Sequence, residues 1–537
     1  MNAKIRVAGI CAALAVLALM VLLLVRPSLD PAHIRPLPFI IVAWLAFLTA
    51  AWLLRKVPLR LSMLLILLGG IAIQAAAVSA PPQNSNDLYR YIWDGQVQAA
   101  GIDPYAYSPA STHLDGLRND FLWYPDAEYC VKSSQYFTSG CTRVNRPTVH
   151  TIYPPVAEAY FLAVHYEPDA TTSTTPLQST TAGFAVLTTA LLLFGLRRLR
   201  RDIRMAALWA WCPTVALEAG NSAHVDVVAV AITVAALLLL ATARNTRRTV
   251  AGGVLLGLAI ATKMTPALTV PALLRRRWLA VATSAASAVV VVYIPHLLAV
   301  GGKVIGFMPG YLQQEGYENG TRFGIIDLVV GGKAAIVVAV LVMAGVALAV
   351  LRFADPDQPW RGAVVMTATA LAVATPHYQW YSLLLVVLVA LDGRPEWLAF
   401  AAGGYYAAEP GMGHLTVPWP YTDAFGYGMP VLVVTAGWLI RRHLAERGAA
   451  PATVPSTAAA VAAATVAAAT APPILPEPIP AGTARAEPIL ARPLTAGPLT
   501  AGPVAAVAAE EAAISAPPLR SILADDEPLP LPRRVRV

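Results

Sequence analysis

Two carboxylates, a guanidinium and a phenol occur at helical spacing in the stretch NDLYRYIWDG (86–95). If this stretch is a helix, Asp87, Arg90, Tyr91 and Asp94 stand at positions i, i+3, i+4 and i+7 and share one face. Capping of a helix would explain one acid in the first turn. It would not explain a guanidinium and a second carboxylate further along the same face. The spacing therefore predicts a functional site.

The apolar segments around this stretch indicate the class of protein. Of the 537 residues, 57% are hydrophobic and 13% are charged, whereas about a quarter of the residues are charged in soluble domains. Apolar runs of about 17–25 residues recur along the chain, which is typical of a polytopic helical membrane protein. We therefore expect an all-α integral membrane fold with about 11–14 membrane segments. The first run, 6–25, is too long for a signal peptide and lacks a small-residue cleavage site after it.

The basic residues predict the orientation of these segments. We expect membrane segments near 6–25, 38–54, 62–79, 180–196, 203–219, 223–242, 250–262, 265–274, 278–300, 334–351, 361–375, 381–392, 395–408 and 426–440. Alternation from a cytoplasmic N-terminus places more than half of the 39 Lys and Arg residues in the cytoplasmic loops. The positive-inside rule then puts both termini in the cytoplasm and the long loop 80–179 outside. The net charge of +8 consists mostly of these anchors, so we expect no nucleic-acid partner.

Four further polar clusters fall between apolar segments on the predicted outer side. They are NSAHVD (221–226), LLGLAIATKMTP (255–266), GYENGTRFG (316–324) and ATPHYQWYS (374–382), and their candidate residues are His224, Asp226, Lys263, Arg322, His377 and Trp380. Each cluster alone has an ordinary explanation, such as turn capping, snorkelling of a lysine or an aromatic belt. Because all of them face the same compartment as Asp87, they favour one shared site.

These residue types suit transfer of a sugar from a lipid-linked donor. Asp87 can act as the general base for a hydroxyl that attacks the sugar carbon C1, and one carboxylate suffices for an inverting displacement. The ammonium of Lys263 can stabilise the charge on a leaving phosphate. Tyr91 and Trp380 can stack on a sugar or line a lipid groove. The chain has no Gly-rich nucleotide-binding loop, which suits a donor that is already attached to a lipid.

The sequence calls for no cofactor. It contains no CxxC motif and no histidine cluster with the spacing of metal ligands, so we expect no structural zinc site. Oxygen coordination of a divalent cation by Asp87 and Asp94 stays open.

The chain divides into a membrane domain, 1–443, and an Ala- and Pro-rich cytoplasmic tail, 444–537, which we expect to be disordered. In the outer loop, VAEAYFLAVHY (156–166) is too short to span a bilayer and predicts an interfacial helix. The Ser/Thr-rich run 169–181 predicts a linker into the next segment.

Two of the four cysteines, Cys130 and Cys141, lie in the outer loop. Their spacing suits a small closed loop, and an exported compartment permits a disulfide between them.

The motifs DLYRYIWDG, GIDPYAYSP, YPP, HVD, GLAIATKMTP and PHYQWY together resemble the GT-C superfamily of integral-membrane glycosyltransferases. Within it, the chain is similar to the actinobacterial polyprenyl-phosphate-mannose-dependent mannosyltransferases, close to glycosyltransferase family 87. The resemblance implies transfer of mannose to an envelope glycolipid or lipoglycan, with Asp87 as the base and with Lys263 and His377 at the donor. In one departure, family members place this aspartate in the first outer loop, whereas here it follows three predicted segments.

Two other functions fit part of the pattern. The same fold could use another lipid-linked sugar, such as arabinofuranose. A transporter or flippase of lipid-linked sugars would also need a polar outer cavity, but alternating access requires polar groups along both halves of the path. The predicted inner side carries mainly arginine anchors, which favours the enzyme.

Overall fold

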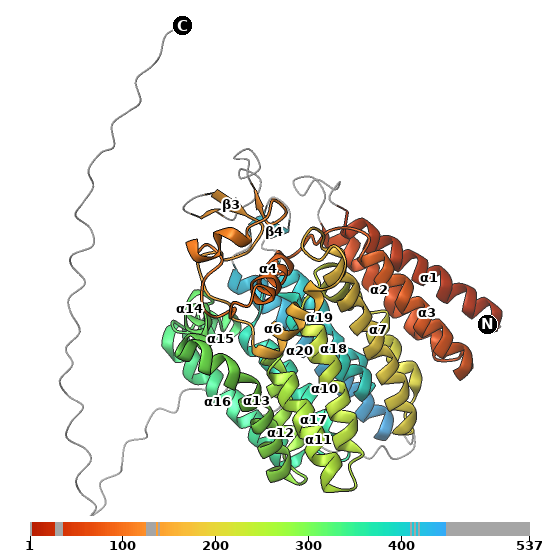
Figure 1. Cartoon of the computed structure of the whole chain (residues 1–537). Coiled ribbons are helices and arrows are strands. Elements are labelled where there is room, and N and C mark those ends of the chain that lie inside the picture. Colours follow the sequence, from red (N-terminus) through yellow and green to blue (C-terminus); the bar gives the residue numbers. More distant parts are fainter. Residues whose placement is uncertain are drawn as a thin grey trace, which may run out of the picture. The chain divides into compact units, whose positions relative to one another are not determined.

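The computed structural model describes residues 3–26, 36–124, 136–137, 140–408, 411–412, 415–416 and 419–446 (Figure 1). All described residues belong to one compact unit, Met1–Ala471. Cys130 and nearly all of the predicted tail lie outside the described residues, so the domain boundary at 443 stays a prediction.

Seven helices in the described part of the chain are long and apolar enough to cross a membrane. They are α1 (Ala3–Leu24), α2 (Pro36–Leu54), α3 (Leu59–Ala77), α7 (Thr175–Arg198), α13 (Trp278–Val300), α16 (Gly332–Phe353) and α20 (Trp419–Glu446). Each lies at a predicted segment, which confirms the all-α, polytopic membrane fold. Many of their large apolar side chains are exposed, as in a helix that faces lipid.

Five of the other predicted segments form shorter helices. They are α10 (Asp226–Ala241), α11 (Thr246–Ile260), α17 (Pro359–Ala374), α18 (Leu383–Asp392) and α19 (Ala399–Ala407). Every residue of α18 is buried. The predicted number of about 11–14 segments includes these helices, although none reaches the roughly 20 residues that a full span requires.

The segment 203–219 is not one helix, contrary to the prediction. It is divided into η2 (Ile203–Ala206), α8 (Ala207–Ala210), α9 (Pro213–Val215) and the π-helical turn η3 (Ala216–Asn221). Pro213 has no N–H to continue a helix, so the chain turns there. The α9–η3 piece and α10 are bent by 119° relative to each other. This bend places His224 at a turn inside the fold.

The predicted linker 169–181 is shorter than expected. Helix α7 begins at Thr175 with Pro176 in its first turn, where proline is favoured because its fixed φ suits a helix start. The second half of the Ser/Thr-rich run is therefore helical.

The basic loops lie together at one end of the described bundle, as alternation of the segments predicts. Arg204, which follows α7, donates to the Val57 carbonyl between α2 and α3 at 3.1 Å. Arg201 donates to the Asp392 carbonyl at the end of α18 at 2.8 Å. The polar clusters 221–226, 255–266 and 374–382 therefore belong to the opposite end. Which end faces the cytoplasm stays a prediction.

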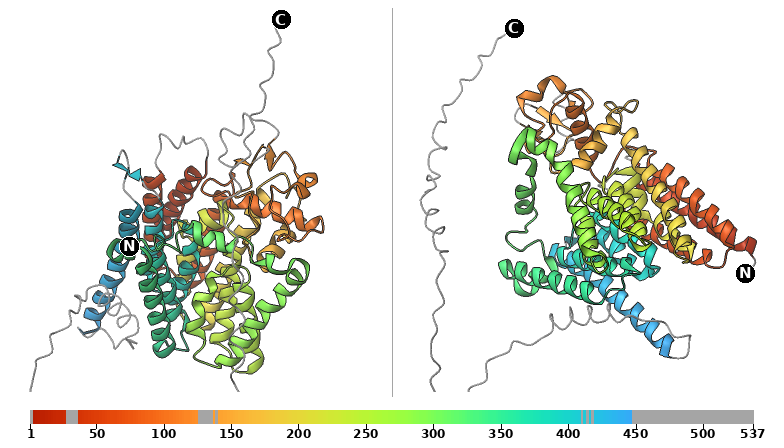
Figure 2. Two further views of the ribbon diagram at one scale, coloured as in Figure 1. Left: turned by 90° about the vertical axis from the view of Figure 1, so that its left-hand side faces the viewer. Right: turned by 60° about the horizontal axis from the view of Figure 1, so that its bottom comes forward.

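The outer loop folds over the end that carries the polar clusters (Figures 1 and 2). It contains α4 (Asp87–Ala99), η1 (Thr112–Leu117), the strands β1 (Trp123–Tyr124), β2 (Tyr136–Phe137) and β3 (Gly140–Thr142), and α6 (Pro155–His165). The strands form a small antiparallel sheet in the order β1–β3–β2. Helix α6 coincides with the predicted short helix 156–166.

Helices α4 and α6 pack tightly because Gly95 lies at their contact. A Cβ atom at position 95 would lie 2.6 Å from the backbone oxygen of Phe161, closer than packed atoms approach. At its first turn, α6 is joined to another part of the chain, since the Val156 N–H donates to the Ala261 carbonyl at 3.0 Å. Ala261 directly follows α11 and precedes Lys263 by two residues.

The remaining short elements lie in the connections between the helices described above. They are η4 (Thr265–Thr269), α12 (Val270–Leu273), η5 (Gly301–Ile305), α14 (Met308–Gln314), α15 (Gly324–Val330), η6 (Gln379–Ser382), η7 (Pro395–Leu398), β4 (Gly411–Met412) and β5 (Leu415–Thr416).

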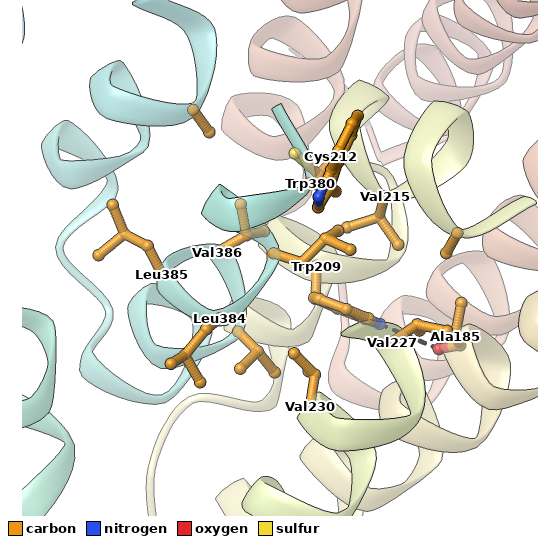
Figure 3. Packing of buried hydrophobic residues seen from close by; sticks show 14 of the residues in the cluster. Ala185, Trp209, Cys212, Val215, Val227, Val230, Trp380, Leu384, Leu385 and Val386 are labelled. Atoms are coloured by element: carbon orange, nitrogen blue, oxygen red, sulfur yellow. Dashed lines mark hydrogen bonds between the residues drawn. The ribbon is translucent and has the colours of Figure 1, made fainter. Parts of the chain in front are cut away.

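A continuous apolar core lies below the outer loop. Figure 3 shows Trp209 among Val227, Val230 and Leu384, with its indole N–H donating to the Ala185 carbonyl at 2.9 Å. This bond satisfies the polar atom of a side chain that is wholly buried. Trp380 belongs to the same cluster, and it also lines the cavity described next. The core therefore supports one wall of that cavity.

Candidate active site

A cavity of about 780 Å³ lies at the end of the bundle that carries the polar clusters. Four of the residues that the sequence singles out line it together, namely Asp87, Lys263, His377 and Trp380. The other polar and aromatic residues of its wall include Asn145, Arg146, Tyr153, Tyr311, Gln314, Tyr378, Gln379, Tyr381 and Tyr405. These residues, from six separate parts of the sequence, thus meet in one cavity.

Asp87 is the only carboxylate among the described residues that line this cavity. It begins α4, and its Oδ1 accepts a hydrogen bond from the side-chain amide of Asn145. The imidazole Nδ1 of His224 lies 3.7 Å from its Oδ2. Burial raises the pKa of Asp87, although the nearby charges of Lys263 and Arg146 oppose this shift. A carboxylate with a raised pKa is a stronger base than one in water.

Lys263 follows α11 and extends into the cavity. Its Nζ lies 3.1 Å from Oδ2 of Asp226, and the two side chains are 16% and 4% exposed. Burial opposes the charged form of Lys263, but the Asp226 and Asp87 carboxylates outweigh burial and raise its pKa. The ammonium is therefore charged and held in place. A snorkelling lysine would instead extend towards water.

Arg146 provides a second cation to the cavity wall, and sequence reasoning missed it. Its guanidinium lies 5.5 Å from the ring centre of Tyr311 and 3.7 Å from Oε1 of Glu315. Glu315 also binds Arg322 at 3.0 Å and accepts from the Tyr378 hydroxyl at 3.1 Å. Arg322, a predicted contact to substrate, is thus a buried partner of Glu315 and does not line the cavity.

Stacked rings form another wall. The ring of Trp380 stacks with that of Tyr378, at 4.7 Å, and with that of His224, at 3.9 Å. His224 is completely buried and lies behind Trp380 and Asp87, outside the cavity lining. His377 lines the cavity, and its Nε2 lies 2.9 Å from Oδ1 of Asp423. An aromatic face next to a carboxylate is a surface on which a sugar ring can stack.

Arg90, Tyr91 and Asp94 do not line the cavity, although they lie on α4 with Asp87. Arg90 and Asp94 form a buried ion pair at 2.9 Å. Tyr91 stacks on Phe161 with a ring separation of 4.4 Å. Arg90 and Asp94 thus pair with each other on α4, and Tyr91 packs on α6. Asp226 also lies behind the wall, where it holds Lys263.

No group of three or more His, Cys, Asp or Glu side chains is arranged to hold a metal ion within the described ranges. Asp94 cannot share a cation with Asp87 in this arrangement, because its carboxylate is buried against Arg90.

Among the described cysteines, Cys141 is disulfide-bonded, whereas Cys11 and Cys212 are free. Cys130 lies outside the described residues, so its pairing with Cys141 stays a prediction.

The match to a protein family covers the part of the chain that surrounds Lys263. Residues 151–376 match the model of glycosyltransferase family 87. No curated protein matches the chain.

Among solved structures, the chain is similar to an Archaeoglobus fulgidus oligosaccharyltransferase in complex with Zn and sulfate. The identity is 14% and the TM-score 0.32, over 68% of this chain and 53% of that one. It is also similar to the oligosaccharyltransferase AglB of the same organism in complex with an inhibitory peptide and a dolichol-phosphate. Here the identity is 12% and the TM-score 0.32, over 70% of this chain and 55% of that one. The chain thus spans about half the length of these proteins.

The family match includes His224, Asp226, Lys263 and Arg322, and it begins at the TIYPP motif. Asp87 precedes it. Over residues 151–376, the chain matches glycosyltransferase family 87, the family that its motifs resemble.

Proposed function

We propose that this protein transfers mannose from a polyprenyl-phosphate-linked donor to a hydroxyl of an envelope glycolipid or lipoglycan, with inversion at C1. One observation carries the proposal. A single carboxylate, Asp87, shares a cavity with two cations, Lys263 and Arg146, among the described lining residues. The match of residues 151–376 to a glycosyltransferase family supports the reaction class.

The reaction follows from the chemistry of these three side chains. Asp87 accepts the proton of the acceptor hydroxyl while the hydroxyl oxygen attacks C1 of the donor sugar. The bond between C1 and the phosphate oxygen breaks, and its electron pair leaves with the phosphate. Lys263 and Arg146 stabilise the negative charge that gathers on the phosphate. Both cations are held in place by carboxylates before the reaction, so little reorganisation is required.

The single carboxylate also supports inversion. A double displacement with retention uses a second carboxyl group about 5–5.5 Å from the first, as in glycoside hydrolases. The described lining of the cavity contains no second carboxylate. The proposal is therefore one direct displacement.

Apolar residues in the wall support a lipid-linked substrate. Leu24 at the end of α1 and Ile40 in α2 line the cavity together with Leu217 and Ala408. On the same hairpin, Leu45 is 60% exposed, as expected for a surface that faces lipid. The part of the wall formed by Leu24 and Ile40 thus belongs to a hairpin that also has a lipid-facing surface. A sugar attached to a lipid can reach Asp87 along such a wall.

Envelope glycolipid analysis tests this proposal. In cells that lack the gene, mass spectrometry should show loss of a glycolipid or lipoglycan and accumulation of a precursor one hexose smaller. The wild-type gene should restore the product, and an Asp87→Asn gene, expressed at the same level, should not. A mass difference of one pentose would instead indicate arabinofuranose. An unchanged profile, or full restoration by Asp87→Asn, would reject the proposal.

A further inference from the structure

The turn that carries Arg146 has an unfavourable backbone conformation. Arg146 has a φ of 46°, in the left-handed region that residues with a Cβ seldom adopt. Such a conformation persists only where the surrounding structure holds it, and it is frequent at functional sites. Arg146 lines the cavity next to Asn145. The groups that hold this turn therefore determine where two parts of the cavity wall lie.

Arg90 donates hydrogen bonds to the backbone of this turn. Its Nη1 donates to the carbonyl oxygens of Arg146, at 3.4 Å, and Val149, at 3.2 Å. Its Nε donates to both carboxylate oxygens of Asp94 at 2.9 and 3.0 Å. Arg90 and Asp94 are 3% and 2% exposed. The planar guanidinium thus clamps two carbonyls of the turn, while the Asp94 carboxylate neutralises its charge.

Asn145 connects the same turn to Asp87. Its side-chain amide donates to Oδ1 of Asp87, and the bond joins residues 58 positions apart in the sequence. A hydrogen bond to one oxygen fixes the rotation of the carboxylate and directs the other oxygen. In the proposed reaction, the orientation of this carboxylate decides whether it can accept the proton of the acceptor.

We propose that Arg90 and Asn145 are positioning residues, in which Arg90 fixes the turn and Asn145 orients the Asp87 carboxylate. This inference rests on the proposed function. It explains the spacing of the DLYRYIWDG motif, since Asp87, Arg90 and Asp94 lie along one face of α4. The Asp87 carboxylate reaches the cavity. The Arg90 and Asp94 side chains support the turn whose Asn145 orients that carboxylate.

Substitution of Asn145 by Ala tests the second half of the inference. We expect kcat to fall about 10–100-fold, because a hydrogen bond to a charged group is lost, with the KM for the donor nearly unchanged. The bond from Asn145 favours the ionised carboxylate, so its loss raises the pKa of Asp87 further. The acidic limb of the pH profile of kcat/KM should therefore move to higher pH.

Other groups that face Asp87 remain in place in this variant. They are Arg146, Lys263, His224, Asp226, Tyr91 and Tyr153. The probe is radiolabelled short-chain polyprenyl phosphomannose, with the lipid extract of cells that lack the gene as the acceptor.

Substitution of Arg90 by Lys tests the first half. A lysine keeps the charge, but it lacks the planar group that donates to Asp94 through Nε and to the two carbonyls through Nη1 at the same time. We expect kcat/KM to fall about 10–100-fold, with a higher KM for the donor because Arg146 also shifts. The control is Arg118→Lys. Arg118 pairs with Asp115 at 2.6 Å in the same outer loop, does not line the cavity, and should leave the kinetics unchanged.

The outcomes separate this inference from the proposed function. Wild-type kcat and an unmoved acidic limb in Asn145→Ala, with an inactive Asp87→Asn, would reject the role of Asn145 and leave the proposed function standing. Arg90→Lys kinetics equal to those of Arg118→Lys would reject the role of Arg90. An active Asp87→Asn would instead reject the proposed function itself. Retained melting temperatures in detergent show that each variant is folded.

Discussion

The Nζ of Lys263 lies 3.1 Å from Oδ2 of Asp226, and both side chains are largely buried. Asp226 begins α10, whereas Lys263 lies in the turn after α11. The pair therefore joins the ends of two consecutive helices. A buried lysine without a partner would lose its proton readily. The Asp226 carboxylate therefore keeps Lys263 in its charged form in this cavity.

We expect Lys263→Arg to reduce turnover, since a planar guanidinium differs from a compact ammonium in how it meets phosphate oxygens. Lys263→Met should raise the KM for the donor and lower kcat about 10²–10³-fold, because the phosphate is most negative in the transition state. Steady-state kinetics with short-chain polyprenyl phosphomannose provide the measurement.

Lys303→Met is the control for the loss of one lysine at the same end of the protein. Lys303 is exposed and does not line the cavity. Unchanged kinetic constants in both Lys263 variants would mean that Lys263 does not contact the substrate.

Asp87 should set the acidic limb of the pH profile. As a general base it must be ionised, so activity falls as the pH drops through its pKa. Because burial raises that pKa, we expect the limb above the ordinary value of 3.8. Asp87→Asn should lower kcat about 10²–10⁴-fold at pH values above this limb, and its remaining rate should lack the limb. A profile of kcat/KM from pH 4 to pH 9 measures both effects, and a residual rate in Asp87→Asn with the same limb would contradict them.

Glu158 should make the protein less stable as the pH rises. Its carboxyl group is fully buried, accepts from Thr151 at 2.7 Å and from Gln98 at 2.9 Å, and lies near Asp94. Burial, and next the charge of Asp94, raise the pKa of Glu158 well above the ordinary value of 4.5. Above pH 4.5 the Glu158 carboxyl loses its proton in the unfolded chain but keeps it in the folded chain. The free energy of unfolding therefore decreases as the pH rises.

Glu158→Gln should therefore stabilise the protein more at pH 8 than at pH 5. Melting temperatures in detergent at the two pH values provide the measurement. Glu167→Gln removes an exposed carboxylate from the same segment and serves as the control. An equal effect of Glu158→Gln at both pH values would contradict the prediction.

The two neighbouring isoleucines of α2 separate the cavity wall from the lipid-facing surface. Ile40 lines the cavity and is 6% exposed, whereas Ile41 is 50% exposed. We expect Ile40→Ala to raise the KM for a lipid substrate about 10-fold, since apolar contact area is lost. Ile41→Ala should leave it unchanged. Kinetics with donors and acceptors of different chain lengths will show which substrate contacts this wall, and equal KM values for the two variants would contradict such a contact.

Thiol labelling of intact cells tests the predicted orientation. Glu318 and Thr246 are both exposed, and they lie at opposite ends of the described bundle. In a Cys11→Ser background, a membrane-impermeant maleimide should label Glu318→Cys in intact cells and Thr246→Cys only after the cells are opened. The reverse pattern would place the cavity on the cytoplasmic side.

Much of the cavity could be predicted from the sequence because polar residues interrupt apolar segments. Asp87, Lys263, His377 and Trp380 each stand where a helix begins or ends, and alternation of the segments brings those ends together. The position of Lys263, against the general trend of the basic residues, singled it out as a candidate, and it lines the cavity.

Asn145 and Arg146 could not be found in this way. They lie in an irregular turn with no periodicity, and only tertiary contacts with α4 and Glu315 bring them to the wall. For Arg90 and Asp94, the spacing gave the correct helix face. The spacing could not reveal that Arg90 would bind backbone carbonyls of the outer loop, since these partners depend on how the chain packs. Nor could it reveal that Arg90 would pair with Asp94 and not with a substrate. Pro213 can be read in the sequence, but it lies within a continuous apolar run. That run predicted one helix over 203–219, whereas the chain turns at Pro213.

Gly95 and the bond from Val156 to the Ala261 carbonyl have a mechanical consequence. Helix α4, which begins with Asp87, cannot slide along α6 without a clash at Gly95. Helix α6 is in turn tied to the chain two residues before Lys263. The Asp87 and Lys263 side chains are thus connected through α4 and α6, and we expect their separation to change little when substrates bind. We expect parts of the cavity wall outside these two helices, such as α14 with Tyr311, to move when lipid substrates enter.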